Sequence, residues 1–183
     1  MMPAQTVDEG MQGAKPDMNE RHRYDPVAIW LHWLVAVLVL AQFATGWIWG
    51  FFERGSEPRF YLFRTHITLG SAILGLALAR IGWRLTHRAP PLPQGMSRLQ
   101  RIAAHAGHGL LYLAILAQPA LGLLAISAFG KTLGRWPRDL HNLGAKLILA
   151  IVMLHIAAVV WHQFIRRDGL LSRMLPSRLA VRT

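Results

Sequence analysis

The chain alternates four long apolar segments with short polar ones. A helix needs about 20 residues to cross the roughly 30 Å hydrocarbon core of a bilayer, and each segment is near or above that length. The sequence therefore predicts four membrane-spanning helices, over residues 27–52, 60–83, 99–129 and 140–164. The arginines inside the second and third segments lie near their ends, where long side chains can reach the interface: Arg64, Arg80, Arg84 and Arg101.

The polar stretches are short, so neighbouring helices should run antiparallel and pack together. The expected fold class is all-α, an integral-membrane antiparallel four-helix bundle. The third segment is longer than one span, and we expect its start to lie along the membrane interface. Gln118 and Pro119 lie inside it and should kink the helix, because proline lacks the backbone N–H and its ring clashes with the preceding turn.

The two ends of the chain differ from its middle. Residues 1–22 are polar and of mixed charge, without the basic-then-apolar order of a signal peptide. We expect them to form a flexible cytoplasmic tail. Residues 23–176 then make up the transmembrane domain, and residues 177–183 form a basic C-terminal tail.

The composition agrees with a membrane protein, because 53% of the residues are hydrophobic and only 16% are charged. That balance excludes a disordered chain and is unusual for a soluble domain. The formal net charge is +11, but the arginines cluster between the apolar segments, which is typical of membrane-flanking positions and not of a nucleic-acid-binding face. The chain has no cysteine, which excludes disulfides, iron–sulfur clusters, thiolate metal sites and covalently attached c-type haem.

The distribution of basic residues predicts which helix ends face the cytoplasm, since cytoplasmic loops carry an excess of lysine and arginine. The middle loop and the C-terminal region are richer in them, with Arg80, Arg84, Arg88, Arg98, Arg101, Arg166, Arg167, Arg173, Arg178 and Arg182. The first and third loops carry Arg54, Arg59, Arg64, Lys131, Arg135 and Arg138. We therefore expect both termini on the cytoplasmic side, which we call the inner side.

Four histidines fall within the apolar register of the segments: His32, His66, His141 and His155. An ionisable side chain left without a partner inside a membrane costs several kcal/mol, so it is a candidate functional residue. One isolated histidine is better explained as a neutral ring hydrogen-bonded to a neighbouring helix. Four histidines on matching levels of three helices instead favour two haem irons with two imidazole ligands each.

The depth of each histidine in the membrane predicts how the four pair. His141 and His155 lie fourteen residues apart on nearly the same face of the fourth segment, about 21 Å along its axis. His32 lies about 9 Å from the inner start of the first segment, and His66 about 9 Å from the outer start of the second. We predict that His66 and His141 ligate an outer haem, and that His32 and His155 ligate an inner haem.

Other polar residues near these levels allow more than one interpretation. His162 competes with His155 for the inner site, but it lies about 31 Å along the helix from the outer ligand, so we expect it at the inner interface near propionates, water or lipid headgroups. His105 and His108 lie at i and i+3, which leaves open a proton path, a quinone site, a propionate contact or plain interfacial residues. Lys146 either pairs with a haem propionate or extends to the outer surface.

Paired imidazoles suit electron transfer. Two neutral imidazoles leave a low-spin haem iron with no open coordination position, so such a site passes electrons without readily binding oxygen. The expected cofactors are therefore two molecules of haem b, and no catalytic residue is assigned.

The segments resemble the bacterial cytochrome b561 family of small four-helix, dihaem b-type cytochromes of the inner membrane. The matching stretches are RYDPVAIWLHWLVA at the first segment, the His66-x-x-x-Gly70 start of the second, HAGHGLLY in the third, and HNLGAKLILAIVMLHIAAVVWHQFIRRDGLLSRMLP across the fourth. The resemblance covers roughly residues 24–176. It implies the same four haem ligands, His32, His66, His141 and His155, in the same pairing.

The resemblance also implies a function. Family members exchange electrons with the ubiquinone pool, so we expect a cytochrome that transfers electrons across the inner membrane between quinone and a periplasmic or small-molecule partner. One branch resembles superoxide oxidases, and basic outer loops would steer a small anion, so superoxide:ubiquinone oxidoreductase is an alternative. Two further alternative functions are a haem-bearing membrane anchor of a hydrogenase or dehydrogenase, and a transporter or structural bundle whose histidines bind nothing. Whether the chain is an enzyme stays open, and no nucleic-acid partner is expected.

Overall fold

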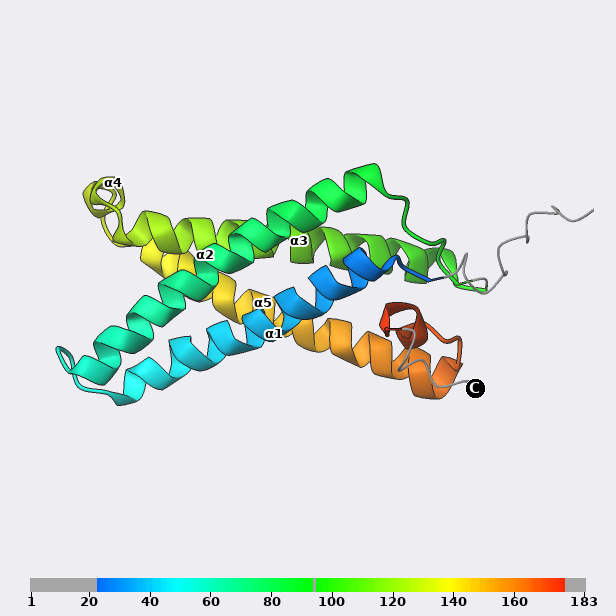
Figure 1. The fold of residues 1–183 in the computed structure, drawn as a ribbon, viewed down its shortest axis with the longest axis horizontal. Coiled ribbons are helices and arrows are strands. Elements are labelled where there is room, and N and C mark those ends of the chain that lie inside the picture. The colour runs from blue at the N-terminus through cyan, green and yellow to red at the C-terminus, as the bar shows by residue number, and fades with distance from the viewer. Residues whose placement is uncertain (1–22, 94, 177–183) are drawn as a thin grey trace, which may run out of the picture.

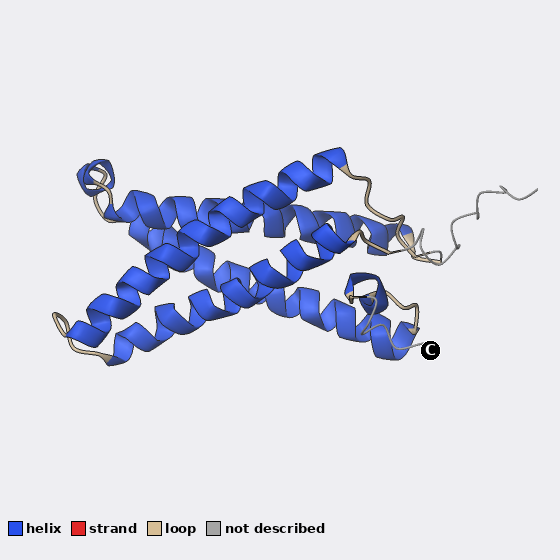
Figure 2. Cartoon of the chain, in the orientation of Figure 1, coloured by secondary structure: helices blue, strands red, loops and turns tan. Residues whose placement is uncertain are grey.

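The computed structural model describes residues 23–93 and 95–176, so the tails expected over residues 1–22 and 177–183 lie outside the described residues. Within this part of the chain the regular structure is helical (Figure 2). The long helices are α1 (Pro26–Ile48), α2 (Glu57–Thr86), α3 (Arg98–Ile126) and α5 (Trp136–Trp161). The short ones are η2 (Trp49–Phe51), α4 (Ala128–Thr132), η3 (His162–Arg166) and η4 (Leu171–Met174).

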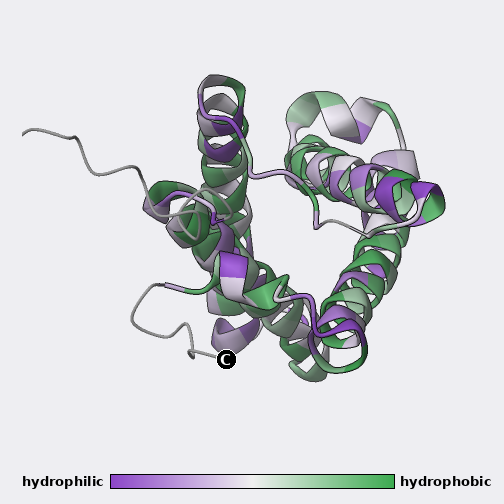
Figure 3. Cartoon of the chain, turned by 90° about the vertical axis from the view of Figure 1, so that its right-hand side faces the viewer, coloured by the Kyte–Doolittle hydropathy of each residue, from purple (hydrophilic) through white to green (hydrophobic). Residues whose placement is uncertain are grey.

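The four long helices confirm the predicted all-α fold with four possible membrane spans. Helical stretches long and apolar enough to cross a membrane cover Pro26–Phe51, Glu57–Thr86, Arg98–Ile126 and Trp136–Arg166. Many large apolar side chains on them are exposed, Leu85 at 82% and Leu154 at 70% among them. Figure 3 shows hydrophobic residues along the helix bodies and hydrophilic residues gathered at the end that faces the viewer, which is the right-hand end in Figure 1. Apolar exposure on this scale suits a bundle that faces lipid.

Two helical hairpins make up the bundle (Figure 1). α1 packs against α2, α3 packs against α5, and α2 also packs against α3. The turns of both hairpins, residues 49–56 and 127–135, lie at one end, which corresponds to the predicted outer side. The start of α1, the loop between α2 and α3, and the C-terminal residues lie at the opposite, inner end.

Capping residues explain where two of the long helices begin. The Asp25 carboxylate accepts a hydrogen bond of 2.9 Å from the backbone N–H of Ala28, and Pro26 occupies the first turn of α1. Ser97 and Gln100 form a reciprocal capping box at the start of α3. Both arrangements satisfy backbone N–H groups that a helix start leaves without partners.

The third span differs from the expected one at its outer end. α3 is one continuous helix from Arg98 to Ile126, so it ends three residues before the predicted bound of 129, and the separate helix α4 begins at Ala128. Ser127 has an extended backbone, with φ −70° and ψ 159°, and its hydroxyl accepts a hydrogen bond of 2.9 Å from Gly130 N–H. The serine therefore ends one helix and caps the next, which an apolar pattern alone does not reveal.

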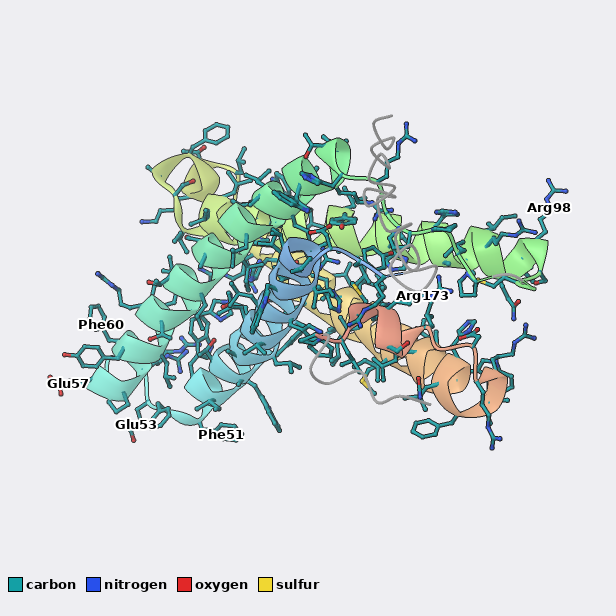
Figure 4. The ribbon with its side chains drawn as sticks, turned by 45° about the vertical axis from the view of Figure 1, so that its right-hand side comes forward. Phe51, Glu53, Glu57, Phe60, Arg98 and Arg173 are labelled. Carbon is teal, nitrogen blue, oxygen red and sulfur yellow. The ribbon has the colours of Figure 1, made fainter. Side chains whose placement is uncertain are left out.

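The C-terminal residues 167–176, which we call the C-terminal hook, fold back onto the inner end of the bundle. The hook starts at Arg167, which has a positive φ of 53°. The indole N–H of Trp33 in α1 donates to the Met174 carbonyl at 2.7 Å. The side chain of Arg173 donates to the Pro91 carbonyl at 2.8 Å, and Figure 4 labels this arginine beside the inner part of the bundle. The hook thus connects α1, which carries His32, to the loop between α2 and α3.

Candidate functional site

The outer half of the bundle brings His66 of α2 together with His141 of α5. Their ring centroids are 6.3 Å apart, and the ring planes lie at 79° to each other. Both side chains line a cavity of about 1460 Å³ that residues of α1 and α3 also line. Ligand pockets commonly hold about 300–1,000 Å³, so this cavity has room for a large cofactor.

Hydrogen bonds at Nδ1 define the tautomer of both outer rings. His141 Nδ1 lies 2.9 Å from the Gln118 carbonyl oxygen, and because a carbonyl only accepts, Nδ1 carries the proton. His66 Nδ1 lies 3.1 Å from the hydroxyl oxygen of Thr45, whose own proton is donated to the Gln42 carbonyl at 3.0 Å. The Thr45 oxygen is therefore left to accept from His66. Each ring keeps a lone pair on Nε2, the state in which a neutral imidazole binds a metal.

The separation of the outer rings fits one shared metal ion. An imidazole–metal bond is about 2.0–2.1 Å long in zinc sites. If the Nε2 atoms of both rings point at one metal ion, the distance between the ring centroids is the sum of two such bonds and of the distance from each Nε2 to the centre of its ring. This sum is close to the 6.3 Å between the centroids of His66 and His141. The residues present therefore fit axial ligation of one haem iron.

Glycines leave space beside both outer rings. A Cβ atom at Gly46 would lie 3.1 Å from Cε1 of His66, and a Cβ atom at Gly122 would lie 2.9 Å from Cε1 of His141. Any larger residue at Gly122 would displace the ring or the helix. These glycines belong to the first helix of each hairpin, and each faces the histidine of the second helix.

The inner half of the bundle brings three histidines together. His32 of α1 and His155 of α5 have ring centroids 6.4 Å apart, with the planes at 64°. His108 of α3 lies 5.7 Å from His155, centroid to centroid, and its Nδ1–H donates to the Ala104 carbonyl of its own helix at 2.6 Å. The sequence spacing of His105 and His108 does not predict the contact between His108 and His155, because that contact depends on how α3 crosses α5.

Arg80 of α2 also turns into the inner half. Its Nε donates to the Tyr112 hydroxyl at 3.1 Å, and its Nη1 lies 2.9 Å from His32 Nδ1. From the sequence we expected the Arg80 side chain to reach the membrane interface. It instead stays inside the bundle, where it contacts the Tyr112 hydroxyl and the His32 ring. None of the carboxylates in the described part of the chain pairs with it. A cation inside a span without a counter-ion is a candidate anion-binding group.

The other candidate residues, His162, His105 and Lys146, have different surroundings. His162 is buried, and its Nδ1 lies 2.5 Å from a carboxylate oxygen of Asp168 in the C-terminal hook. His105 is exposed on α3. Lys146 is exposed and lines the outer cavity, as do Arg54, Arg59 and Arg138. An acidic residue, Glu57, lines it too, and Figure 4 labels this residue near the outer end of α2.

Comparisons with known proteins identify the family that has this architecture. Residues 23–177 match the family model for the prokaryotic cytochrome b561. Cytochrome b562 of Cereibacter sphaeroides is 32% identical over 165 residues, which cover 88% of this chain and 100% of the relative. The probable superoxide oxidase CybB of Yersinia pestis is 27% identical over 173 residues, 85% of this chain and 97% of the relative. Cytochrome b561 homolog 1 of Escherichia coli is 24% identical over 177 residues, 86% of this chain and 99% of the relative. As the histidine and span pattern predicted, the chain belongs to the prokaryotic cytochrome b561 family, whose members bind b-type haem.

Proposed function

We propose that this membrane cytochrome b carries two haems and transfers electrons across the bacterial inner membrane, between the quinone pool and a periplasmic or small-molecule partner. One observation carries the proposal. Two histidine pairs, one in each half of the bundle, have nearly equal ring separations of 6.3 and 6.4 Å. Each pair joins α5 to a different helix, so a single bundle offers ligands at two depths.

The two histidines of each pair would hold one haem through their imidazole nitrogens. When bound, haem b supplies a one-electron carrier whose bis-imidazole iron has no open position. His66 and His141 hold their Nε2 lone pairs ready through the hydrogen bonds at Nδ1. His32 and His155 would hold the inner haem. Arg80, which donates to Tyr112 and faces His32 Nδ1, would bind a haem carboxylate after turning away from His32.

The direct test is a reduced-minus-oxidised optical spectrum of the detergent-purified protein, with haem quantified per chain as the pyridine haemochrome. We expect two b-type haems per chain, with low-spin spectra that carbon monoxide does not change. One haem per chain would leave one histidine pair without the proposed role, and a colourless protein would remove the role of both.

Single substitutions test the assignment of ligands. His66→Ala or His141→Ala should remove the outer haem alone, and His32→Ala or His155→Ala the inner haem alone. The matched controls are His108→Ala and His162→Ala, which should keep both haems. If the His108 variant lost the inner haem and the His32 variant kept it, His108 would replace His32 as the proposed partner of His155.

A specific observation favours superoxide:quinone oxidoreductase as a second candidate. The outer cavity is lined by the cations Arg54, Arg59, Arg138 and Lys146, and a relative of 27% identity is named a probable superoxide oxidase. Such a mouth would attract a small anion. The reaction would oxidise two superoxide ions to two molecules of oxygen at the outer end and pass both electrons to one quinone, which takes up two protons to form quinol.

Proteoliposomes containing ubiquinone test this second candidate. Superoxide generated outside should reduce the quinone, and the Arg54→Gln/Arg59→Gln variant should lose this activity while it retains both haems. Equal rates for the parent and for protein-free liposomes would exclude the activity.

A further inference from the structure

The two hairpins repeat one arrangement of a glutamine, a histidine and two glycines. In the first hairpin, Gln42 and Gly46 lie on α1, and His66 and Gly70 lie on α2. The His66 ring lies against Gly46, where a Cβ atom would be 3.1 Å from Cε1. The Gln42 amide lies against Gly70, where a Cβ atom would be 3.1 Å from Nε2.

The second hairpin has the same four residue types on the corresponding helices, although its glycine follows the histidine by three residues instead of four. Gln118 and Gly122 lie on α3, and His141 and Gly144 lie on α5. The His141 ring lies against Gly122, and the Gln118 side chain lies so close to Gly144 that a Cβ atom there would overlap the amide oxygen. In both hairpins, the Nδ1–H of the histidine is directed to the main-chain carbonyl of the glutamine, at His141 directly and at His66 through Thr45.

The two copies differ in what the glutamine amide does. Gln118 Nε2 donates to the main-chain carbonyl of His141 at 2.7 Å, while the His141 ring donates back to the Gln118 carbonyl at 2.9 Å. The two residues thus form a reciprocal pair. Gln42 makes no such bond to His66, and its Oε1 is buried without a hydrogen-bond partner among the described residues.

We propose that Gln118 is a positioning residue for His141, and that it sets the reduction potential of the outer haem. This inference rests on the proposed ligation by His141. The amide fixes the main chain of His141, and the Gln118 carbonyl fixes the ring, so one residue determines both the place and the tautomer of the ligand. A hydrogen bond from Nδ1–H to a carbonyl makes the imidazole a stronger electron donor, which favours the oxidised iron and lowers the potential.

The test compares potentiometric titrations of the parent and of Gln118→Met, which keeps the length of the side chain but removes the amide. The Gln118 main-chain carbonyl remains in this variant, so the substitution acts by releasing the main chain of His141, which weakens the bond from its Nδ1–H to that carbonyl. The variant should retain both haems, and the outer potential should rise while the inner potential stays unchanged. Gly144→Ala should give the same shift, because its methyl group displaces the Gln118 amide. The double variant should shift no further than either single one, since both changes remove one contact.

Gln42→Met is the matched control in the first hairpin, and it should leave the outer potential unchanged. Gly107→Ala is the control in α3, because a Cβ atom there meets nothing within 4 Å. An unchanged outer potential in Gln118→Met would overturn the inference, as would equal shifts in the Gln42 and Gln118 variants. Should Gln118→Met fail to fold, Gln118→Asn decides in the same way, because its amide is too short to keep the contact. A parent protein without an outer haem would instead refute the proposed function, so the two failures are distinct.

Discussion

At the scale of single residues, the outer and inner histidine pairs differ in the group that faces Nδ1. Acceptors face His66 and His141, so their Nε2 atoms are free to bind iron. A donor, Arg80, faces His32, so Nδ1 of that ring acts as the acceptor. Ligation through Nε2 of His32 requires the other tautomer, and Arg80 must then turn to a different acceptor. A haem carboxylate at the inner site would provide one.

We therefore predict that Arg80→Gln weakens retention of the inner haem and spares the outer one. Loss of an outer-shell partner typically costs about 10- to 100-fold in affinity for a bound metal group, and we expect about the lower figure here. Haem per chain after repeated washing and the difference spectrum measure the effect. Arg84→Gln is the control, since it removes the same charge from an exposed position one turn away. Equal losses in both variants would attribute the effect to the overall charge of the inner end.

Sequence reasoning reached the four candidate histidines because helical rise converts residue number into depth. It did not reach the Gln118–His141 pair or the inward turn of Arg80. Both depend on the rotation of a helix about its axis and on the angle at which it crosses its neighbour, neither of which follows from spacing. A polar residue inside an apolar span was the available signal for Gln118, but the neighbouring Pro119 suggested a kink instead.

At the scale of elements, the apolar pattern located the helices well because length and hydropathy alone define a span. It overestimated the third span at its outer end, where Ser127 interrupts a run that is still apolar. The C-terminal hook was not predicted. Two of its contacts are made by the main-chain carbonyls of Met174 and Leu175, which accept from residues about 140 positions or more away in sequence, and no local pattern encodes them.

The start of α1 supports a prediction about stability and pH. Partial burial raises the pKa of Asp25, but hydrogen bonds from Ala28 N–H and the Trp83 indole outweigh it and hold the pKa below its usual value. Asp25→Ala should destabilise the protein by about 1 kcal/mol at pH 7, as the loss of an N-cap does. Since the carboxylate stabilises the fold above its unfolded-state pKa, this difference should shrink as pH falls through the lowered pKa.

Thermal unfolding in detergent, followed by circular dichroism at pH 7 and at acidic pH, measures that difference. Glu53→Ala is the control, because its exposed carboxylate makes no hydrogen bond within the described residues. A difference between Asp25→Ala and the parent that stays constant down to acidic pH would exclude the carboxylate as its cause.

At the scale of the whole molecule, the two histidine pairs and the two hairpins give the bundle an outer and an inner half. The outer half holds the large cavity, and the C-terminal hook and Arg80 make hydrogen bonds to α1 in the inner half. If the inner half faces the cytoplasm, electrons entering at the outer cavity move inward along α5, which carries one histidine of each pair. The orientation of the bundle therefore decides which side of the membrane the outer cavity and each histidine pair lie near.

We predict that the inner end faces the cytoplasm, because the loop between α2 and α3 and the C-terminal residues carry more arginine than the outer turns. The chain has no native cysteine, so single cysteines can be introduced on a clean background. Thr132→Cys in the outer turn and Thr86→Cys at the inner end of α2 are matched, exposed positions. A membrane-impermeant thiol reagent added to intact spheroplasts should label the first and reach the second only after lysis. The reverse pattern would place both termini outside, and the cavity with the His66–His141 pair would then lie on the cytoplasmic side.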